Sequence, residues 1–260
     1  MAPAREAARA AGPPPGEPVT YSSDGRALVG HRYRPRAGGP FPAVVVNHGS
    51  GLDQDTKPGV ADVLAGAGYL VLVARRRGYG GSPGPSRLEE VTAPVGSAEH
   101  DAQVCARLLR ESDDVLAALE FVRAMPEVDA TRTAVLGSSY GGINSLLAAS
   151  RDRAVTACVS FGAAAMSWGP VPGLRPFLLR HAEAIRCPVL LVQAENDYDL
   201  APSAAIAEGL RAAGGTCLRH LFPAFGADRH EAHQIWVHAP HLWAPVVLPF
   251  LARHLGGASP

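Results

Sequence analysis

A serine flanked by glycines is the strongest chemical signal in this sequence. Residues 137–141 read GSSYG, which matches the pattern G-x-S-x-G with Ser139 at its centre. An apolar run typical of a strand precedes the motif, and a small-residue segment typical of a helix follows it. A sharp turn between strand and helix exposes a serine oxygen, and flanking glycines avoid clashes there. Ser139 is therefore predicted to be a nucleophile, whereas Ser138 is out of register and is expected to be a packing residue.

A serine hydroxyl is a weak nucleophile and needs a base that an acid holds in place. In folds with this turn, the acid and the base follow the serine in the order Asp, His. Asp197 comes just after the apolar run 188–192, and catalytic groups in open α/β sheets gather at the carboxyl ends of strands. We predict Asp197 to be the acid. Asp199 is the alternative, although a position shortly before a helix also suits a capping role.

Two histidines, His230 and His233, follow the last strand-like run, residues 217–222. The acidic, small and apolar neighbours of His233 suit a loop that turns back toward a site. We therefore favour His233 as the base and keep His230 as the alternative. The other histidines, including His48, are expected to support the site or to lie at the surface.

Two backbone N–H groups are candidates for an oxyanion hole. One belongs to Tyr140, the residue after the nucleophile, and the other should come from the loop after an earlier strand. The segment HGSG at residues 48–51 follows the apolar run 43–46. We nominate the Ser50 N–H, with Gly49 as the next candidate.

The elements that must position these residues alternate regularly between strand-like and helix-like runs. Strands are expected at residues 19–22, 27–33, 43–46, 69–73, 133–136, 154–161, 188–192 and 217–222. Helices are expected at residues 60–67, 98–124, 143–149, 201–213 and 242–254. Asp24-Gly25 is a hairpin turn signal between the first two strands. The pattern predicts an α/β fold, a mostly parallel sheet with helices on both faces and an antiparallel N-terminal hairpin at one edge.

The chain divides into a short tail and one long domain. Residues 1–18, rich in Ala, Pro and Gly, are expected to be a disordered tail, and residues 19–260 a single domain. The longest irregular insert, residues 163–176, could roof a pocket or be an ordinary surface connection. Candidate pocket walls are Tyr140, Trp168, Phe177 and Trp236, although aromatic side chains of this kind are more often core residues.

Composition excludes several classes of protein. The chain has 24 basic and 24 acidic residues and 47% hydrophobic residues, which argues against an intrinsically disordered chain. The absence of a basic excess argues against nucleic acid as the main partner. No apolar run approaches the length of about 20 residues that spans a membrane, and residues 1–18 lack the apolar core of a signal peptide. The four cysteines form no C-x-x-C pair. We therefore expect a cytoplasmic protein without a membrane segment, whose cysteines are buried and reduced.

Taken together, these segments resemble the α/β-hydrolases, most closely the dienelactone hydrolase-like branch. The resemblance runs over residues 19–255 and rests on FPAVVVNHG at residues 41–49, RRGYG at residues 76–80, the turn at Ser139, the acid loop at Asp197 and the His233 segment with Trp243 downstream. It implies a nucleophile–His–Asp triad that needs no metal or other cofactor. It also implies hydrolysis of small esters or lactones.

One position departs from that branch. Enzymes that hydrolyse dienelactone itself are similar in fold but use a cysteine nucleophile, where this chain has Ser139. The departure favours a carboxylesterase that acts on small carboxylic esters or lactones through an acyl-enzyme. An acyltransferase with the same triad is an alternative. A non-catalytic ligand-binding module on the same fold is another, although such a module has no need of all three triad residues.

Overall fold

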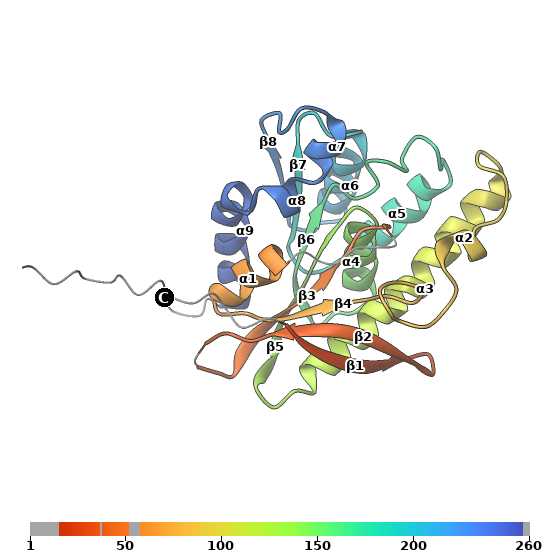
Figure 1. Cartoon of the computed structure of the whole chain (residues 1–260). Coiled ribbons are helices and arrows are strands. Elements are labelled where there is room, and N and C mark those ends of the chain that lie inside the picture. Colours follow the sequence, from red (N-terminus) through yellow and green to blue (C-terminus); the bar gives the residue numbers. More distant parts are fainter. Residues whose placement is uncertain (1–15, 37, 52–57, 257–260) are drawn as a thin grey trace, which may run out of the picture.

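One eight-stranded sheet runs through the molecule and is covered by helices on both faces (Figure 1). The computed structural model describes residues 16–36, 38–51 and 58–256. The strands are β1 Glu17–Ser23, β2 Arg26–Tyr33, β3 Phe41–Asn47, β4 Leu70–Ala74, β5 Val128–Ser138, β6 Val155–Phe161, β7 Val189–Ala194 and β8 Cys217–Phe222. Their order across the sheet is β1-β2-β4-β3-β5-β6-β7-β8.

The strand directions confirm the predicted α/β class. β1 and β2 pair antiparallel around the Asp24-Gly25 turn, and β2 pairs antiparallel with β4. Every other neighbouring pair is parallel. The hairpin therefore forms one edge of the sheet. β1 begins at Glu17, two residues before the expected start of the domain, and residues 1–15 of the expected tail lie outside the described residues. The single domain over residues 19–260 stays a prediction.

Two layers of helices bury the two faces of the sheet. The helices are α1 Pro58–Gly66, α2 Arg87–Glu90, α3 Ala98–Arg123, α4 Tyr140–Arg151, α5 Leu174–Glu183, α6 Ala201–Ala212, α7 Arg229–His233, α8 Ile235–His238 and α9 Pro240–Leu255. One core joins the sheet to α3, α4, α5 and α6, and the other joins it to α1, α8 and α9. The central strands are consequently covered on both sides, which explains why β4 is apolar at all five positions.

Four helices of the structure lie where the sequence predicted no helix. We did not predict α2, α5, α7 or α8, and the insert at residues 163–176 ends inside α5. Pro176 weakened the helical signal there, but it lies in the first turn of α5, where a missing N–H costs nothing. α9 likewise tolerates Pro245 and Pro249 inside its span. α7 begins at the capping residue Asp228, whose carboxylate accepts the N–H groups of His230 and Glu231.

Trp243 should contribute strongly to stability. Its side chain is fully buried, stacks edge-on against Phe161 and donates its indole N–H to the Trp236 carbonyl at 2.8 Å. Trp243→Ala should therefore lower the free energy of unfolding by about 3–5 kcal/mol, measured by urea denaturation. The neighbouring Leu242 is 38% exposed. Leu242→Ala should therefore change the free energy of unfolding by less than about 0.5 kcal/mol. Equal losses in the two variants would contradict this role.

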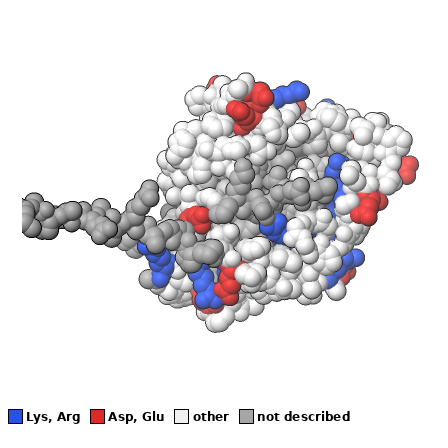
Figure 2. Space-filling view, in the orientation of Figure 1, with Lys and Arg blue, Asp and Glu red and all other residues white. Residues whose placement is uncertain are grey.

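The surface carries charges of both signs. On the face shown in Figure 2, acidic and basic side chains are interspersed among uncharged residues. None of the helices in the described ranges combines the length and the apolar composition needed to cross a lipid bilayer. The expected lack of a nucleic-acid partner stays a prediction.

Candidate active site

Ser139 lies in a strained turn between β5 and α4. It is the N-cap residue of α4, with φ 58° and ψ −121°, a region that non-glycine residues rarely adopt. Its N–H donates to the Phe161 carbonyl of β6 at 2.8 Å, which ties the turn to the next strand. At Gly141 a Cβ atom would collide with the carbonyl groups of Asn47 and His48, so only glycine lets α4 approach the loop after β3. In this turn Ser139 stays partly exposed at the carboxyl end of the sheet.

Asp197 and His233 form a buried pair near this turn. The His233 Nδ1–H donates to Asp197 Oδ1 at 2.8 Å, and each side chain is only 2% exposed. The same carboxylate accepts the Tyr198 N–H at 2.7 Å and the Gln193 side-chain amide at 2.9 Å. Donation from Nδ1 leaves Nε2 as the acceptor nitrogen. Within the described residues, this buried Nε2 has no hydrogen-bond partner.

Gly162, directly after β6, makes room for the pair. Its φ is +54°, and a Cβ atom there would lie 3.0 Å from both the Asp197 carboxylate and the His233 ring. A side chain at this position would therefore push against the acid and the base.

The two alternative residues lie outside this hydrogen-bonded pair, although His230 lines the same cavity as Ser139 and His233. Asp199 Oδ1 accepts the Ala201 N–H, the first N–H of α6, at 2.8 Å, from the position just before the N-cap residue Leu200. His230 is exposed, and its Nδ1 lies 3.4 Å from the Tyr198 hydroxyl. The structure thus brings Asp197 together with His233, and neither Asp199 nor His230 takes part in that hydrogen bond.

Ser139 and His233 open into the same cavity. This cavity has a volume of about 200 Å³, and its walls include Ser50 and Trp236. On the other side of the serine, a second cavity of about 220 Å³ is lined by Tyr140 and by residues of the predicted insert. Both cavities share Ser50, Ser139 and Met166, so the serine lies where two small pockets meet. Residues of the insert at residues 163–176, among them Ser167, Pro170 and Val171, form a wall of the second cavity.

The candidate oxyanion donors lie on two sides of the serine. Tyr140 is the first residue of α4, and the first N–H groups of a helix have no partner within the helix. On the opposite side, the loop after β3 approaches the serine so closely that a Cβ atom on Gly49 would be 3.6 Å from the Ser139 Cβ. Ser50, the next residue, lines both cavities. The loop nominated from the sequence therefore lies beside Ser139, and the roles of the Ser50 and Tyr140 N–H groups as oxyanion donors stay predictions.

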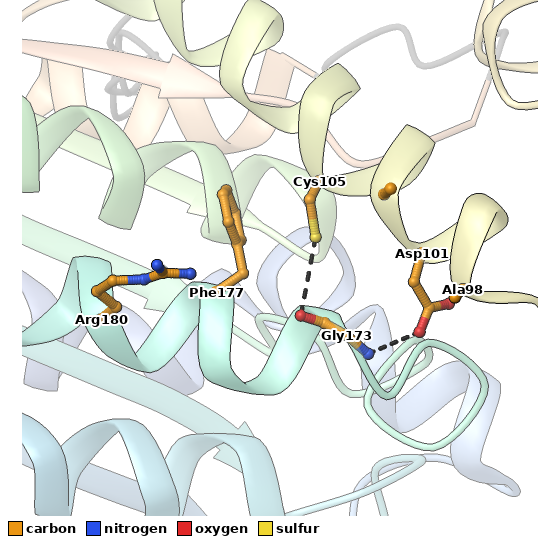
Figure 3. A pocket seen from close by; sticks show the side chains of 7 residues that line it. Ala98, Asp101, Cys105, Gly173, Phe177 and Arg180 are labelled. Carbon is orange, nitrogen blue, oxygen red and sulfur yellow. Dashed lines mark hydrogen bonds between the residues drawn. The ribbon is translucent and has the colours of Figure 1, made fainter.

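A third cavity, of about 340 Å³, lies apart from this chemistry between α3 and α5 (Figure 3). Neither Ser139 nor His233 lines it. Asp101 accepts the Gly173 N–H at 2.6 Å, and the Cys105 thiol lies 3.9 Å from the Gly173 carbonyl. These contacts tie the start of α5 to α3 and give Asp101 a structural role.

The predicted pocket aromatics fall into two groups. Tyr140 and Trp236 line the cavities beside the serine. Trp168 belongs to the hydrophobic core, and Phe177 lines the third cavity, so neither is a wall of the catalytic pockets. Both side chains belong to the hydrophobic core, and apolar composition alone does not distinguish a core residue from a pocket wall.

The four cysteines are free thiols away from the site. Burial raises the pKa of Cys187 to about 12, and it raises the pKa of Cys105 and of Cys217 to about 11. These thiols are therefore protonated and weakly nucleophilic at neutral pH. In the part of the chain that the structure describes, no three His, Cys, Asp or Glu side chains group as metal ligands.

A buried charged network next to the serine escaped the sequence analysis. Arg76, Arg107 and Glu111 are fully buried. Both arginines pair with Glu111, Arg76 Nε at 2.8 Å and Arg107 Nε at 2.7 Å. Charged residues are almost never fully buried unless they are paired. The i, i+4 spacing of Arg107 and Glu111 is a visible sign of pairing, but it also fits a solvent-exposed helix face.

The fold, the strained serine after β5 and the histidine–carboxylate pair beside it define an α/β-hydrolase. Residues 28–240 match the model of the dienelactone hydrolase family, and the chain belongs to that family of hydrolases. An uncharacterized protein of Mycobacterium tuberculosis is 30% identical over 217 residues, which cover 78% of this chain and 68% of the relative.

Solved structures share the fold at low sequence identity. An acylaminoacyl peptidase of Pyrococcus horikoshii superposes with a TM-score of 0.72 at 19% identity, over 95% of this chain but only 42% of that longer protein. The esterase Pf2001 of Pyrococcus furiosus superposes with a TM-score of 0.65 at 18% identity, over 93% of this chain and 91% of the esterase.

Proposed function

We propose that this protein is a serine hydrolase that cleaves small carboxylic esters or lactones with Ser139, His233 and Asp197. One observation carries the proposal. The unpartnered Nε2 face of a carboxylate-bound histidine and a strained serine line the same small cavity. A serine nucleophile needs that arrangement of base and acid. Membership of a hydrolase family and similarity to an esterase fold support it.

The proposed mechanism gives each of these groups a defined role. Ser139 Oγ attacks the ester carbonyl while His233 Nε2 takes its proton, and Asp197 stabilises the imidazolium that forms. The N–H groups of Tyr140 and Ser50 stabilise the oxyanion. His233 then protonates the leaving alcohol, and water activated by the same histidine releases the acid. A lactone would follow the same steps, with the alcohol remaining attached to the acid.

The substrate is proposed to be small. Cavities of about 200 and 220 Å³ are below the usual range of about 300–1,000 Å³ for pockets that hold drug-sized ligands. Two such pockets meeting at the serine suit a short acyl group on one side and a small alcohol on the other. The free cysteines suit a reducing compartment, and a cytoplasmic location is part of the proposal.

Hydrolysis of p-nitrophenyl esters tests the proposal. We expect turnover of the acetate and the butyrate, with a lower kcat/KM for the octanoate because the pockets are short. A fluorophosphonate, which reacts covalently with activated serines, should label Ser139 in the same protein.

Two results would contradict the proposed function. A folded protein that neither turns over any ester nor is labelled would favour a binding module. Slow release of the acid that accelerates strongly with an added alcohol, giving a new ester, would favour acyl transfer.

A further inference from the structure

We propose that Arg76 and His48 are positioning residues that aim the Ser50 N–H at the developing oxyanion. They do so by holding the carbonyl oxygen of the preceding residue, Gly49. This inference rests on the proposed function, because it assigns the residues that prepare the same site for reaction.

The contacts converge on one carbonyl group. Gly49 O accepts a hydrogen bond from Arg76 Nη2 at 3.0 Å and another from His48 Nδ1 at 2.8 Å. Arg76 Nη1 also donates to the His48 carbonyl at 2.8 Å, so one guanidinium holds two consecutive peptide groups of the loop. The planar fork of arginine suits such paired contacts. Both side chains are buried, Arg76 at 0% and His48 at 1% exposure.

Peptide geometry converts this contact into an orientation. The Gly49 C=O and the Ser50 N–H belong to the same planar peptide group, and in a trans peptide they point in opposite directions. Fixing the carbonyl toward Arg76 therefore aims the Ser50 N–H away from Arg76. Ser50 lines both cavities that contain Ser139, and the proposal places its N–H, directed away from Arg76, on the cavity side of the loop.

The state of His48 is consistent with this role. Burial, and next to it the positive charge of Arg76, hold the pKa of His48 well below its usual value. A neutral ring with its proton on Nδ1 can donate to Gly49 O and accept the Arg76 backbone N–H at Nε2, at 3.4 Å. Both ring nitrogens then have partners inside the fold.

Glu111 links the two sides of the proposed oxyanion hole. Its Oε2 accepts Arg76 Nε at 2.8 Å and the Asn144 amide at 3.0 Å. Asn144 also donates to the Tyr140 carbonyl in the first turn of α4. One carboxylate thus holds both the arginine that orients Ser50 and the helix that begins with Tyr140. Donors that are fixed in advance need no reorganisation during the reaction, which is the source of their catalytic value.

Arg107 provides a matched control for Arg76. It is equally buried and bonds the other oxygen of Glu111, but its remaining donors go to Pro85, Arg77 and Glu90 rather than to the loop after β3. Replacing either arginine by methionine removes a buried charge from the same network. Only the change at Arg76 releases the Gly49 carbonyl.

The experiment compares Arg76→Met with Arg107→Met on p-nitrophenyl butyrate and with an aryl trifluoromethyl ketone. The ketone forms a hemiketal with the serine whose oxygen needs the same donors. We expect Arg76→Met to lower kcat by about 10²-fold with little change in KM. The affinity of this variant for the ketone should fall by a similar factor. Arg107→Met should keep kcat within about threefold of wild type while losing stability. Arg76→Lys, which keeps a cation but cannot bond both carbonyls, should be intermediate.

Clear outcomes would overturn the inference. Equal losses of kcat in Arg76→Met and Arg107→Met would mean general damage to the core, and an unchanged kcat in Arg76→Met would mean that the carbonyl contact is not needed. If Arg76→Met does not fold, Arg76→Lys decides, because a folded variant with wild-type kcat and ketone affinity contradicts the role. A wild type without ester turnover or fluorophosphonate labelling instead overturns the proposed function, and the positioning role with it.

Discussion

Ser139→Ala should abolish ester hydrolysis, with kcat lower by a factor on the order of 10⁶. Without the hydroxyl no acyl-enzyme can form, and the histidine alone has only water to activate. The substitution removes one oxygen from a half-exposed turn residue, so the fold should persist. The residual rate would come from binding and from the oxyanion donors. The measurement is kcat on p-nitrophenyl butyrate, with circular dichroism to verify folding.

Ser138→Ala is the matched control for this prediction. Ser138 is the adjacent serine and also lines the cavity, but it is the last residue of β5 and 2% exposed. Its replacement should leave kcat within a few-fold of wild type. The assignment of the nucleophile would be wrong if Ser139→Ala kept its activity while Ser138→Ala lost it. Fluorophosphonate labelling followed by peptide mapping gives an independent answer, because the label should be found on Ser139 alone.

Asp197→Asn should lower kcat by about 10⁴-fold. The carboxylate accepts three hydrogen bonds, from His233 Nδ1, the Tyr198 N–H and the Gln193 amide. An asparagine must turn its NH₂ group toward one of these donors. If it faces His233, the ring moves its proton to Nε2 and can no longer accept the serine proton. The loss of the negative charge also removes the stabilisation of the imidazolium.

Asp199→Asn separates the catalytic acid from its neighbour. Asp199 accepts the Ala201 N–H at the start of α6, and asparagine caps helices about as well as aspartate. We therefore expect nearly unchanged kcat and stability for this variant. A small loss in Asp197→Asn together with a large loss in Asp199→Asn would reverse the assignment.

Most of the fold could be predicted from the sequence. All eight strands were expected near their observed positions. The signal was clearest for β3, β4 and β7, because a parallel strand buried on both faces is a short, continuous apolar run. The antiparallel edge followed from the Asp24-Gly25 turn. The long helix α3 was visible in its apolar stripe and begins and ends within one residue of the expected bounds. These features depend on neighbours in the chain, which a single sequence displays.

The helices that the sequence did not predict are very short or contain a proline. α7 and α8 are only five and four residues long, too short to show a helical period. α5 was hidden by a proline that its first turn tolerates. His233 was expected in a loop, whereas it is the last residue of α7. Tertiary packing rather than local propensity decides whether such short segments are helical.

At the candidate site, too, the sequence displayed the local features but not the contacts between residues that are far apart in the chain. The strand–turn–helix signal at Ser139 is local, so the sequence alone identified the strained turn and the order of the candidate acid and base. The sequence favoured Asp197 over Asp199 and His233 over His230, but only the tertiary structure shows that this carboxylate and this ring meet across 36 residues. The pairing of Arg76 with Glu111 spans 35 residues, and composition would assign both to the surface. Burial and hydrogen bonding between distant segments arise only when the chain has folded, so the tertiary structure alone decided how the loop carrying Ser50 is held.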